Sequence, residues 1–447
     1  MRRNRLLLGT VLSVLLLVYP IISAKAAASM WGQTYDAFYN DVACSLVATS
    51  DGGYALAGSS GFFDVSDSDC WLVKTDTDGN MEWNKTYGAS LDGDWAYSLI
   101  VTSDGGYALA GVQNCSASPL ELHYWHYFYN DLGGDCWLVK TDANGNMEWN
   151  NTYGGTGDDW ALSLINASDG GYVLAGYTSS FGAGGRDAWL VKTDATGTME
   201  WNQTYGGTWN DMAFSLVATS DGGYALAGTW RSDASDFDFW LVKTDEFGSM
   251  EWNKTYGGTN DDVAFSLVAT SDGGYALAGY ATFLGEGSED VWLVKTDANG
   301  DMEWNNTYGG GHPWWNDEAY SLVETSDGGY ALAGSTQSPG TGSVNCWLLK
   351  TDGYGNIMWN HTYGGDLVDL AYSLIATSDG GYAAAGAWCI RMLESGHFDF
   401  LLIKTDENGV APVAPEAAWV VLPFLLAATV SLFISKKKPL HSRVKEK

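Results

Sequence analysis

Apolar residues along this chain occur in short runs of six to eight positions, separated by Gly, Asp and Asn. In one stretch the runs are 160–167, 172–177, 188–193 and 199–205. Each run carries aromatic and β-branched residues at the density of a strand and is too short for a typical helix, so the pattern predicts four consecutive β-strands. The same order of runs recurs along the chain with a period of 51 to 55 residues, stretched once to 65.

Two motifs mark every copy of this repeat. One is S-D-G-G-Y, with its Asp at Asp51, Asp104, Asp169, Asp221, Asp272, Asp327 and Asp379. The other is W-L-V-K-T-D or a near copy, which begins at Trp71, Trp137, Trp189, Trp240, Trp292, Trp347 and Leu401. The period is the length of one four-stranded propeller blade. We therefore predict an all-β fold over residues 29–409, a seven-bladed β-propeller of four-stranded antiparallel blades.

The last copy lacks a fourth strand of its own. A W-x-x-T-Y strand precedes every copy, and the seventh copy ends at 408–409 without one. We therefore expect residues 31–35 to complete the last blade, which closes the ring and removes an open sheet edge. The first-to-second and third-to-fourth connections are uniform turns, whereas the second-to-third connection varies in length. The variable loops should therefore gather on one face.

The two ends of the chain differ from the repeats. Basic residues precede an apolar run at 6–18, and small residues follow at 23–28, which predicts a signal peptide over 1–28 with an uncleaved anchor as the alternative. After a linker at 410–416, residues 417–435 are apolar and span about 28 Å as a helix, enough to cross a bilayer. The basic tail 436–447 should remain in the cytoplasm. The sequence thus predicts a single-pass cell-surface protein with its ectodomain outside.

The repeats are strongly acidic. They contain 52 of the 54 acidic residues but only 12 of the 22 Lys and Arg, a net charge of about −40. Such a surface repels nucleic acid and anionic lipid and favours cations or basic partners. Solubility in a salty exterior is the alternative explanation.

The motif order resembles a known repeat family. The stretch TYGGTGDDWALSLINASDGGYVLAGYT is similar to the unit of the bacterial and archaeal β-propeller repeat family called SBBP, and the resemblance covers all seven copies. It implies a propeller fold and a secreted or surface location, and it implies little about activity. The stretch APEAAWVVLPFLLAATVSLFISKKK resembles the C-terminal ends of archaeal surface proteins, although Ala417 stands where an aromatic residue usually follows Pro-Glu.

Aromatic residues gather in the variable loops. The long insertion in the second copy contains Tyr124, Trp125, Tyr127, Phe128 and Tyr129, and the entry to the sixth copy adds His312, Trp314 and Trp315. Other loops add Phe62, Phe63, Trp209, Trp230 and Trp388. Exposed aromatic rings stack on sugars or anchor a protein partner, so we predict a ligand site on this face. The alternative is that each ring covers its own blade as a local cap.

One Asp per copy stands two residues before an Ala at the start of the first strand. These residues are Asp41, Asp94, Asp159, Asp211, Asp262, Asp317 and Asp369. If the first strands line a central channel, the seven carboxylates converge near its outer mouth, where Ca²⁺ or another hard cation would bind. Alternatively, each carboxylate accepts hydrogen bonds from the Gly-rich connection beside it.

Sequons and cysteines complete the set of candidate residues. The sequence W-N-x-T recurs in the fourth strand and predicts glycosylation at Asn84, Asn150, Asn202, Asn253, Asn305 and Asn360. Cys115 and Cys136 bracket the long insertion, and a disulfide there would add roughly 3 kcal/mol to stability. As the alternative, Cys136 lies at a position that apolar residues fill in other copies, which favours a plain core residue.

Signs of catalysis are few. The six His never recur at one repeat position, and the chain has no G-x-S-x-G, no H-E-x-x-H and no zinc-spaced Cys pair. We expect no catalytic residues and no cofactor other than Ca²⁺. The favoured function is a monomeric propeller that binds a glycan or protein partner at the cell surface through its variable loops. The alternatives are a mainly structural envelope glycoprotein and, third, a propeller-type hydrolase.

Overall fold

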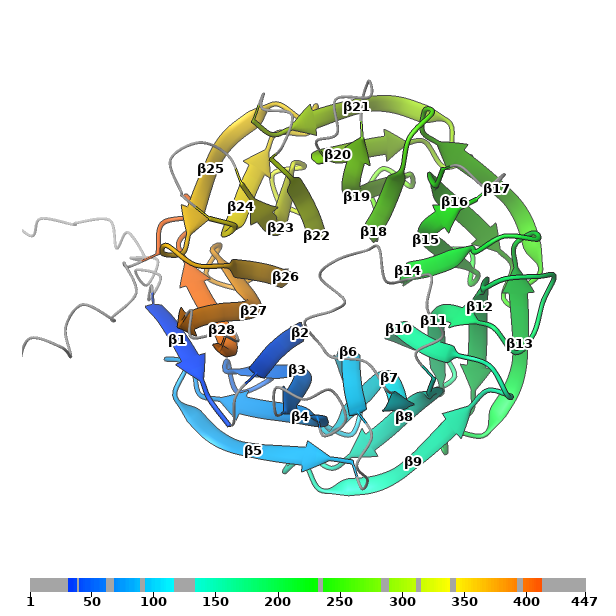
Figure 1. The fold of residues 1–447 in the computed structure, drawn as a ribbon, viewed down its shortest axis with the longest axis horizontal. Helices are drawn as coiled ribbons and strands as arrows, with labels where there is room; N and C mark the ends of the chain where they lie inside the picture. Colours follow the sequence, from blue (N-terminus) through cyan, green and yellow to red (C-terminus); the bar gives the residue numbers. More distant parts are fainter. Residues whose placement is uncertain are drawn as a thin grey trace, which may run out of the picture.

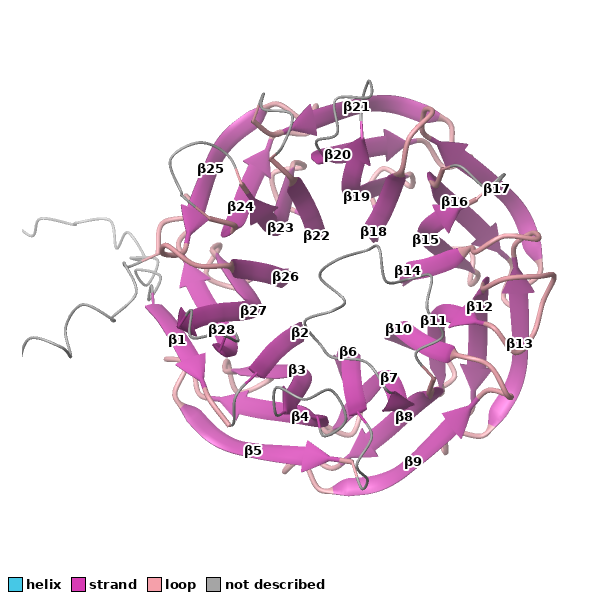
Figure 2. Ribbon diagram, viewed as in Figure 1, coloured by secondary structure: helices cyan, strands magenta, loops and turns pink. Residues whose placement is uncertain are grey.

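The computed structural model describes residues 31–37, 40–61, 68–88, 93–115, 133–231, 236–282, 289–310, 315–337, 343–391 and 397–411. These residues form 28 strands and no helix, and the strands surround a central axis as a β-propeller (Figures 1 and 2). Within these ranges no helix is long and apolar enough to span a membrane. The predicted signal peptide at 1–28, the membrane helix at 417–435 and the tail at 436–447 lie outside the described residues.

The strands fall into four classes by their distance from the axis (Figure 1). The innermost are β2 (Asn40–Ala48), β6 (Gly93–Val101), β10 (Asp159–Asn166), β14 (Met212–Ala218), β18 (Asp262–Ala269), β22 (Asp317–Glu324) and β26 (Asp369–Ala376). The second are β3 (Tyr54–Gly61), β7 (Tyr107–Cys115), β11 (Tyr172–Thr178), β15 (Tyr224–Trp230), β19 (Tyr275–Thr282), β23 (Tyr330–Thr336) and β27 (Tyr382–Arg391). The third are β4 (Ser68–Thr75), β8 (Asp135–Thr141), β12 (Asp187–Thr193), β16 (Asp238–Thr244), β20 (Glu289–Thr296), β24 (Asn345–Thr351) and β28 (His397–Thr405). The outermost are β1 (Trp31–Tyr35), β5 (Met81–Tyr87), β9 (Met147–Tyr153), β13 (Met199–Tyr205), β17 (Met250–Tyr256), β21 (Met302–Tyr308) and β25 (Ile357–Tyr363).

Each blade is a set of four antiparallel strands. Five separate sheets consist of four consecutive strands, from β6–β9 to β22–β25. The remaining sheet joins β26–β28 to β2–β5 through one parallel bridge between Asn40 and Phe398, and β1 pairs with β28 in it. That pairing is antiparallel and runs from Trp31 opposite Lys404 to Tyr35 opposite Phe400. The first and last described strands therefore share one sheet.

The apolar cores lie between blades rather than within them. One cluster combines Leu138 and Tyr153 of the β6–β9 blade with Leu164, Leu174 and Trp189 of the next blade. The Tyr153 hydroxyl also donates to the carbonyl of Gly197 in that next blade, at 2.6 Å. The repeated Trp, Tyr and Leu positions are therefore packing positions. Equivalent clusters recur between the other neighbouring blades.

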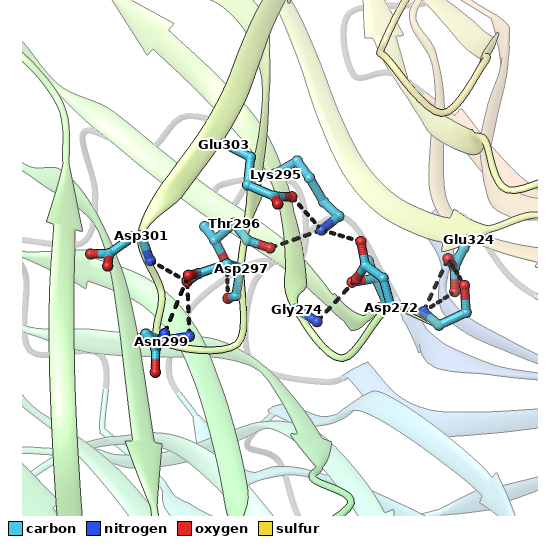
Figure 3. Close-up of polar contacts among 11 residues, drawn as sticks. Asp272, Gly274, Lys295, Thr296, Asp297, Asn299, Asp301, Glu303 and Glu324 are labelled. Carbon is cyan, nitrogen blue, oxygen red and sulfur yellow. Dashed lines mark hydrogen bonds and ion pairs between the residues drawn. The ribbon is translucent and has the colours of Figure 1, made fainter.

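A buried lysine in the third strand ties together the turns of each blade. Figure 3 shows this network for Lys295, whose Nζ lies 2.8 Å from Asp272 and 2.9 Å from Glu303. The same ammonium donates to the carbonyl of Thr296 at 2.8 Å. A buried charge is costly unless it is paired, so the Asp of S-D-G-G-Y and the Lys of W-L-V-K-T-D are required by each other. The two sequence motifs are one structural unit.

The β22–β25 blade departs from this arrangement. Met358 replaces the glutamate there, and its sulfur lies 3.6 Å from the Nζ of Lys350. Asp327, at 2.9 Å, is the carboxylate that pairs with this lysine. Lys350 is as deeply buried as Lys295 but has one carboxylate partner where Lys295 has two.

We predict that Asp327→Asn destabilises the protein more than Asp272→Asn. Loss of Asp327 leaves a buried ammonium without a carboxylate and should cost about 2 kcal/mol, whereas Lys295 keeps Glu303 and the loss should be about 1 kcal/mol. Chemical unfolding followed by circular dichroism measures both. As a matched control, Met358→Glu restores the second partner and should reduce the effect of Asp327→Asn. Equal losses in the two blades would contradict this account.

Candidate functional site

The described aromatic residues of the variable-loop face separate into caps and exposed rings; Trp230 and Trp388, predicted in loops, lie at the end of β15 and within β27. Trp230 packs on Trp240 with ring centroids 5.1 Å apart, and Trp388 is buried, so both act as caps. Trp209 and Phe181 remain 40% and 44% exposed. Trp315 is half-buried, while Tyr124, Trp125, Tyr127, Phe128, Tyr129, His312 and Trp314 lie outside the described residues. Trp230 and Trp388 therefore cover their own blades, whereas Trp209 and Phe181 are exposed and could contact a ligand.

Trp209 stands in the connection between β13 and β14, beside an arginine from the following loop. The Cζ of Arg231 lies 5.6 Å from the Trp209 ring and 5.0 Å from the Phe237 ring. Cations in this position are attracted by the negative face of the ring. We call Trp209, Arg231 and Phe237 the Trp209 platform. It combines an exposed indole with a fixed positive charge on a strongly acidic protein.

Backbone hydrogen bonds hold this platform in place. The Asp211 amide donates to the Arg186 carbonyl at 2.7 Å, and the Arg186 amide donates to the side-chain oxygen of Asn210 at 3.0 Å. The Arg231 amide donates to Asp211 at 2.8 Å. The loops of two neighbouring blades are therefore bonded to each other at the two residues that follow Trp209. Such preorganisation lowers the entropy cost of binding.

The seven predicted channel carboxylates are all buried. Asp211 accepts from the Gly207 amide at 2.7 Å, and Asp369 accepts from the Gly365 and Cys389 amides at 2.9 and 3.0 Å. Asp41, Asp94, Asp159, Asp262 and Asp317 make equivalent bonds to backbone N–H groups. This is the structural role weighed as the alternative to a cation site. A Ca²⁺ ion at this ring stays a prediction.

A second acidic column escaped the sequence analysis. It lies two residues before the third-strand Trp, at Asp69, Asp135, Asp187, Asp238, Asp290, Asn345 and Asp399. Six of the seven lie across a glycine from the acidic residue that starts the innermost strand of the next blade; Asp399 is the exception, because Asp36 stands at that position. A Cβ on Gly206 would lie 2.3 Å from a side-chain oxygen of Asp187 and 2.7 Å from one of Asp211, so a larger residue there would have to displace these side chains. The sequence does contain this column, as an Asp at the same position in every copy but one, but an Asp at the start of a strand did not by itself indicate a special role.

A collar of side chains lines the innermost strands. In each blade the first strand bulges at the residue after the conserved Ala, as between Ala161 and Ser163. The bulged residues are Cys44, Tyr97, Leu162, Phe214, Phe265, Tyr320 and Tyr372. Ring centroids are 5.4 Å apart for Phe214 and Phe265 and 5.1 Å for Tyr320 and Tyr372. The collar gives the innermost wall an apolar band, which sequence analysis missed because its members vary from copy to copy.

A pair of glutamates, Glu318 buried and Glu289 half-buried, interrupts this apolar wall. Glu318 stands where the other copies carry Val, Trp, Met or Leu, and Glu289 lies on the neighbouring β20 strand. Tyr320 donates to Glu318 at 2.7 Å, and Asn316 donates to Glu289 at 2.8 Å. Burial, reinforced by the negative charge of Glu318, raises the pKa of Glu289. The packing of the repeat does not require a carboxyl group with a raised pKa, and such groups cluster at functional sites.

The two cysteines of the predicted disulfide lie in apolar cores, and the predicted glycosylation sites lie on the outermost strands. None of the six cysteines, all of which the structure describes, forms a disulfide; Cys115 packs with Trp95 and Trp160, whereas Cys136 packs with Leu138 in another core, so the expected bridge is not formed. The sequon residues Asn84, Asn150, Asn202, Asn253, Asn305 and Asn360 are exposed on the outermost strands. In five of these six the side-chain oxygen accepts from a third-strand Trp indole, as for Asn202 and Trp189 at 3.1 Å.

No protein-family model matches the chain. It is 25% identical over 236 residues to lectin SfL-2 of Solieria filiformis. The aligned region covers 46% of this chain and 83% of the lectin. It is 25% identical over 205 residues to regulatory protein FlaEY of Caulobacter vibrioides, covering 41% of this chain and 21% of FlaEY. The chain thus spans most of the lectin and about a fifth of FlaEY.

Solved structures resemble the chain at low identity. Sqt1 from Chaetomium thermophilum has a TM-score of 0.46 at 12% identity, with 87% of this chain and 88% of that chain covered. An acylaminoacyl peptidase from Pyrococcus horikoshii has a TM-score of 0.42 at 10% identity, with 88% and 54% covered.

The two sets of carboxylates predict opposite responses to pH. Hydrogen bonds from Lys74 and Lys243 lower the pKa of Asp51 and Asp221 to about 2, so the stability they add above about pH 4 is lost as pH falls toward 2. Burial raises the pKa of Asp262 to about 7, so the folded state binds that proton more tightly and loses stability as pH rises from about 4 to 7.

We therefore expect maximal stability near pH 4 to 5, with a decline up to pH 8 that Asp262→Asn reduces. Melting temperatures measured across this range test the prediction. Asp297→Asn, at an exposed turn residue whose pKa is lowered by the Asp301 and Asn299 amides, is the control and should leave the decline unchanged. Parallel profiles for the wild type and Asp262→Asn would exclude Asp262 as the titrating group.

Proposed function

We propose that this protein is a cell-surface glycan-binding propeller whose variable-loop face carries the ligand site. The observation that carries the proposal is the Trp209 platform, an indole left 40% exposed beside the guanidinium of Arg231. Aromatic faces bind the apolar faces of sugar rings, and a guanidinium donates hydrogen bonds to their oxygens. The similarity to a lectin over 83% of that lectin's length supports the same class of ligand.

The remaining parts of the proposal concern architecture. We infer seven blades closed into a ring by β1, with residues 29–409 forming one monomeric propeller. The chain would be held to the membrane through 417–435, with the signal peptide at 1–28 directing export. The aromatic insertion that contains Tyr124 to Tyr129 would extend the binding face, and His312, Trp314 and Trp315 would add to it. Glycans at the sequons would cover the outermost strands.

A second candidate function rests on the acid pair. Burial raises the pKa of Glu289, which lies beside Glu318, and a carboxyl group with a raised pKa is suited to general acid catalysis. A propeller-type hydrolase would need this pair to reach a substrate. Assays of glycan hydrolysis by the wild type and by Glu289→Gln address it. The structural-glycoprotein alternative predicts neither binding nor hydrolysis.

We expect Trp209→Ala to weaken glycan binding at least tenfold, because a central aromatic anchor contributes about 2 kcal/mol. A glycan array with the purified full chain identifies a ligand, and calorimetry then compares the variants. Phe247→Ala removes a ring that is 62% exposed in a third-to-fourth turn, on the opposite face, and serves as the matched control. Unchanged binding by both variants, or binding to no glycan, would refute the proposal.

A further inference from the structure

A residue that breaks the repeat follows β1, in the sheet that joins the first and last described strands. After its final Tyr, the fourth strand is followed by glycine at Gly88, Gly154, Gly206, Gly257, Gly309 and Gly364. The strand β1 ends at Tyr35, and the next residue is Asp36. At this position alone among the seven, a carboxylate replaces the glycine that lies between two acidic columns.

Asp36 faces two potential metal ligands on β28. The Nε2 of His397 lies 3.9 Å from an oxygen of Asp36 and 3.3 Å from an oxygen of Asp399. One ligand atom from each of the three residues lies within 4.8 Å of the other two. Among the described residues, no other three His, Cys, Asp or Glu side chains meet in this way. His397 is also specific to this copy, since the corresponding residues that are described elsewhere are Gly, Asp or Ser.

We propose that Asp36, His397 and Asp399 bind a divalent transition-metal ion, with Zn²⁺ the best fit. Zinc bonds of about 2.0 to 2.1 Å place two tetrahedral ligands about 3.3 Å apart, which matches His397 and Asp399. Asp36 is exposed on its outer side and needs only a small movement to join them. An imidazole nitrogen favours zinc over the hard cations Ca²⁺ and Mg²⁺, which prefer oxygen ligands.

The ion would link the two ends of the propeller. Asp36 follows β1, whereas His397 and Asp399 belong to β28, so a shared metal adds a bond across the pairing of a five-residue strand. The excess of carboxylates raises the local concentration of cations at this surface. Three protein ligands leave one position of a tetrahedral site for water. Because the unfolded chain does not hold these three residues together, binding stabilises the folded state.

The test measures Zn²⁺ binding and melting temperature on the purified full chain. We expect one equivalent of Zn²⁺ after dialysis, and a rise in melting temperature of about 3 °C or more that EDTA reverses. Asp36→Gly restores the residue of the other copies, and His397→Ser introduces a residue found at this position in another copy, so neither should prevent folding. Both variants should lose the bound equivalent and the temperature shift.

Asp366→Gly is the control for net charge, since it removes an exposed acid outside the cluster, and it should retain both signals. Ca²⁺ at the same concentration should not replace Zn²⁺. The proposal is overturned if the wild type retains no Zn²⁺. It is also overturned if Asp36→Gly and His397→Ser bind as much Zn²⁺ as Asp366→Gly, because the ions would then be spread over the acidic surface.

Discussion

Every repeated core of this protein is shared between two neighbouring blades, and the rest of the structure depends on that sharing. Trp189 and Leu174 pack against Leu138 and Tyr153 of the preceding blade rather than against residues of their own sheet alone. A single blade exposes one apolar face on each side and has no stable form by itself. The pairing of β1 with β28 matters for the same reason, because Tyr35 and Phe400 join the core that contains Trp71.

At the ends of each blade, polar residues pair with the charged and backbone groups that this packing buries. Each buried third-strand lysine needs a carboxylate, and the S-D-G-G-Y turn supplies one at the place where the strands reverse. Asp211 and its equivalents hold the opposite ends through backbone N–H groups. Most polar residues of the repeated motif are therefore explained by the structural hydrogen bonds that they form. A residue found in every copy carries little information about a ligand.

Strand order, turn positions and the partner of residues 31–35 were predictable because they depend on local periodicity and on counting. The predicted runs at 172–177 and 199–205 agree with β11 and β13 to within one residue. Which of the individual aromatic side chains are exposed was not predictable. Trp209 lies in the connection between β13 and β14 and is exposed, whereas Trp388 lies within β27 and is buried. Exposure depends on neighbours from other blades, which no local pattern records.

The disulfide prediction failed for a related reason. Sequence spacing put Cys115 and Cys136 at the two ends of one loop, but in the fold the two side chains pack in different cores. The pairing of β1 with β28 brings Asp36 to His397 and Asp399, although more than 360 positions separate them in sequence. The proposed metal site thus lies where the repeat is interrupted, because Asp36 and His397 are residues that the other copies do not have at these positions.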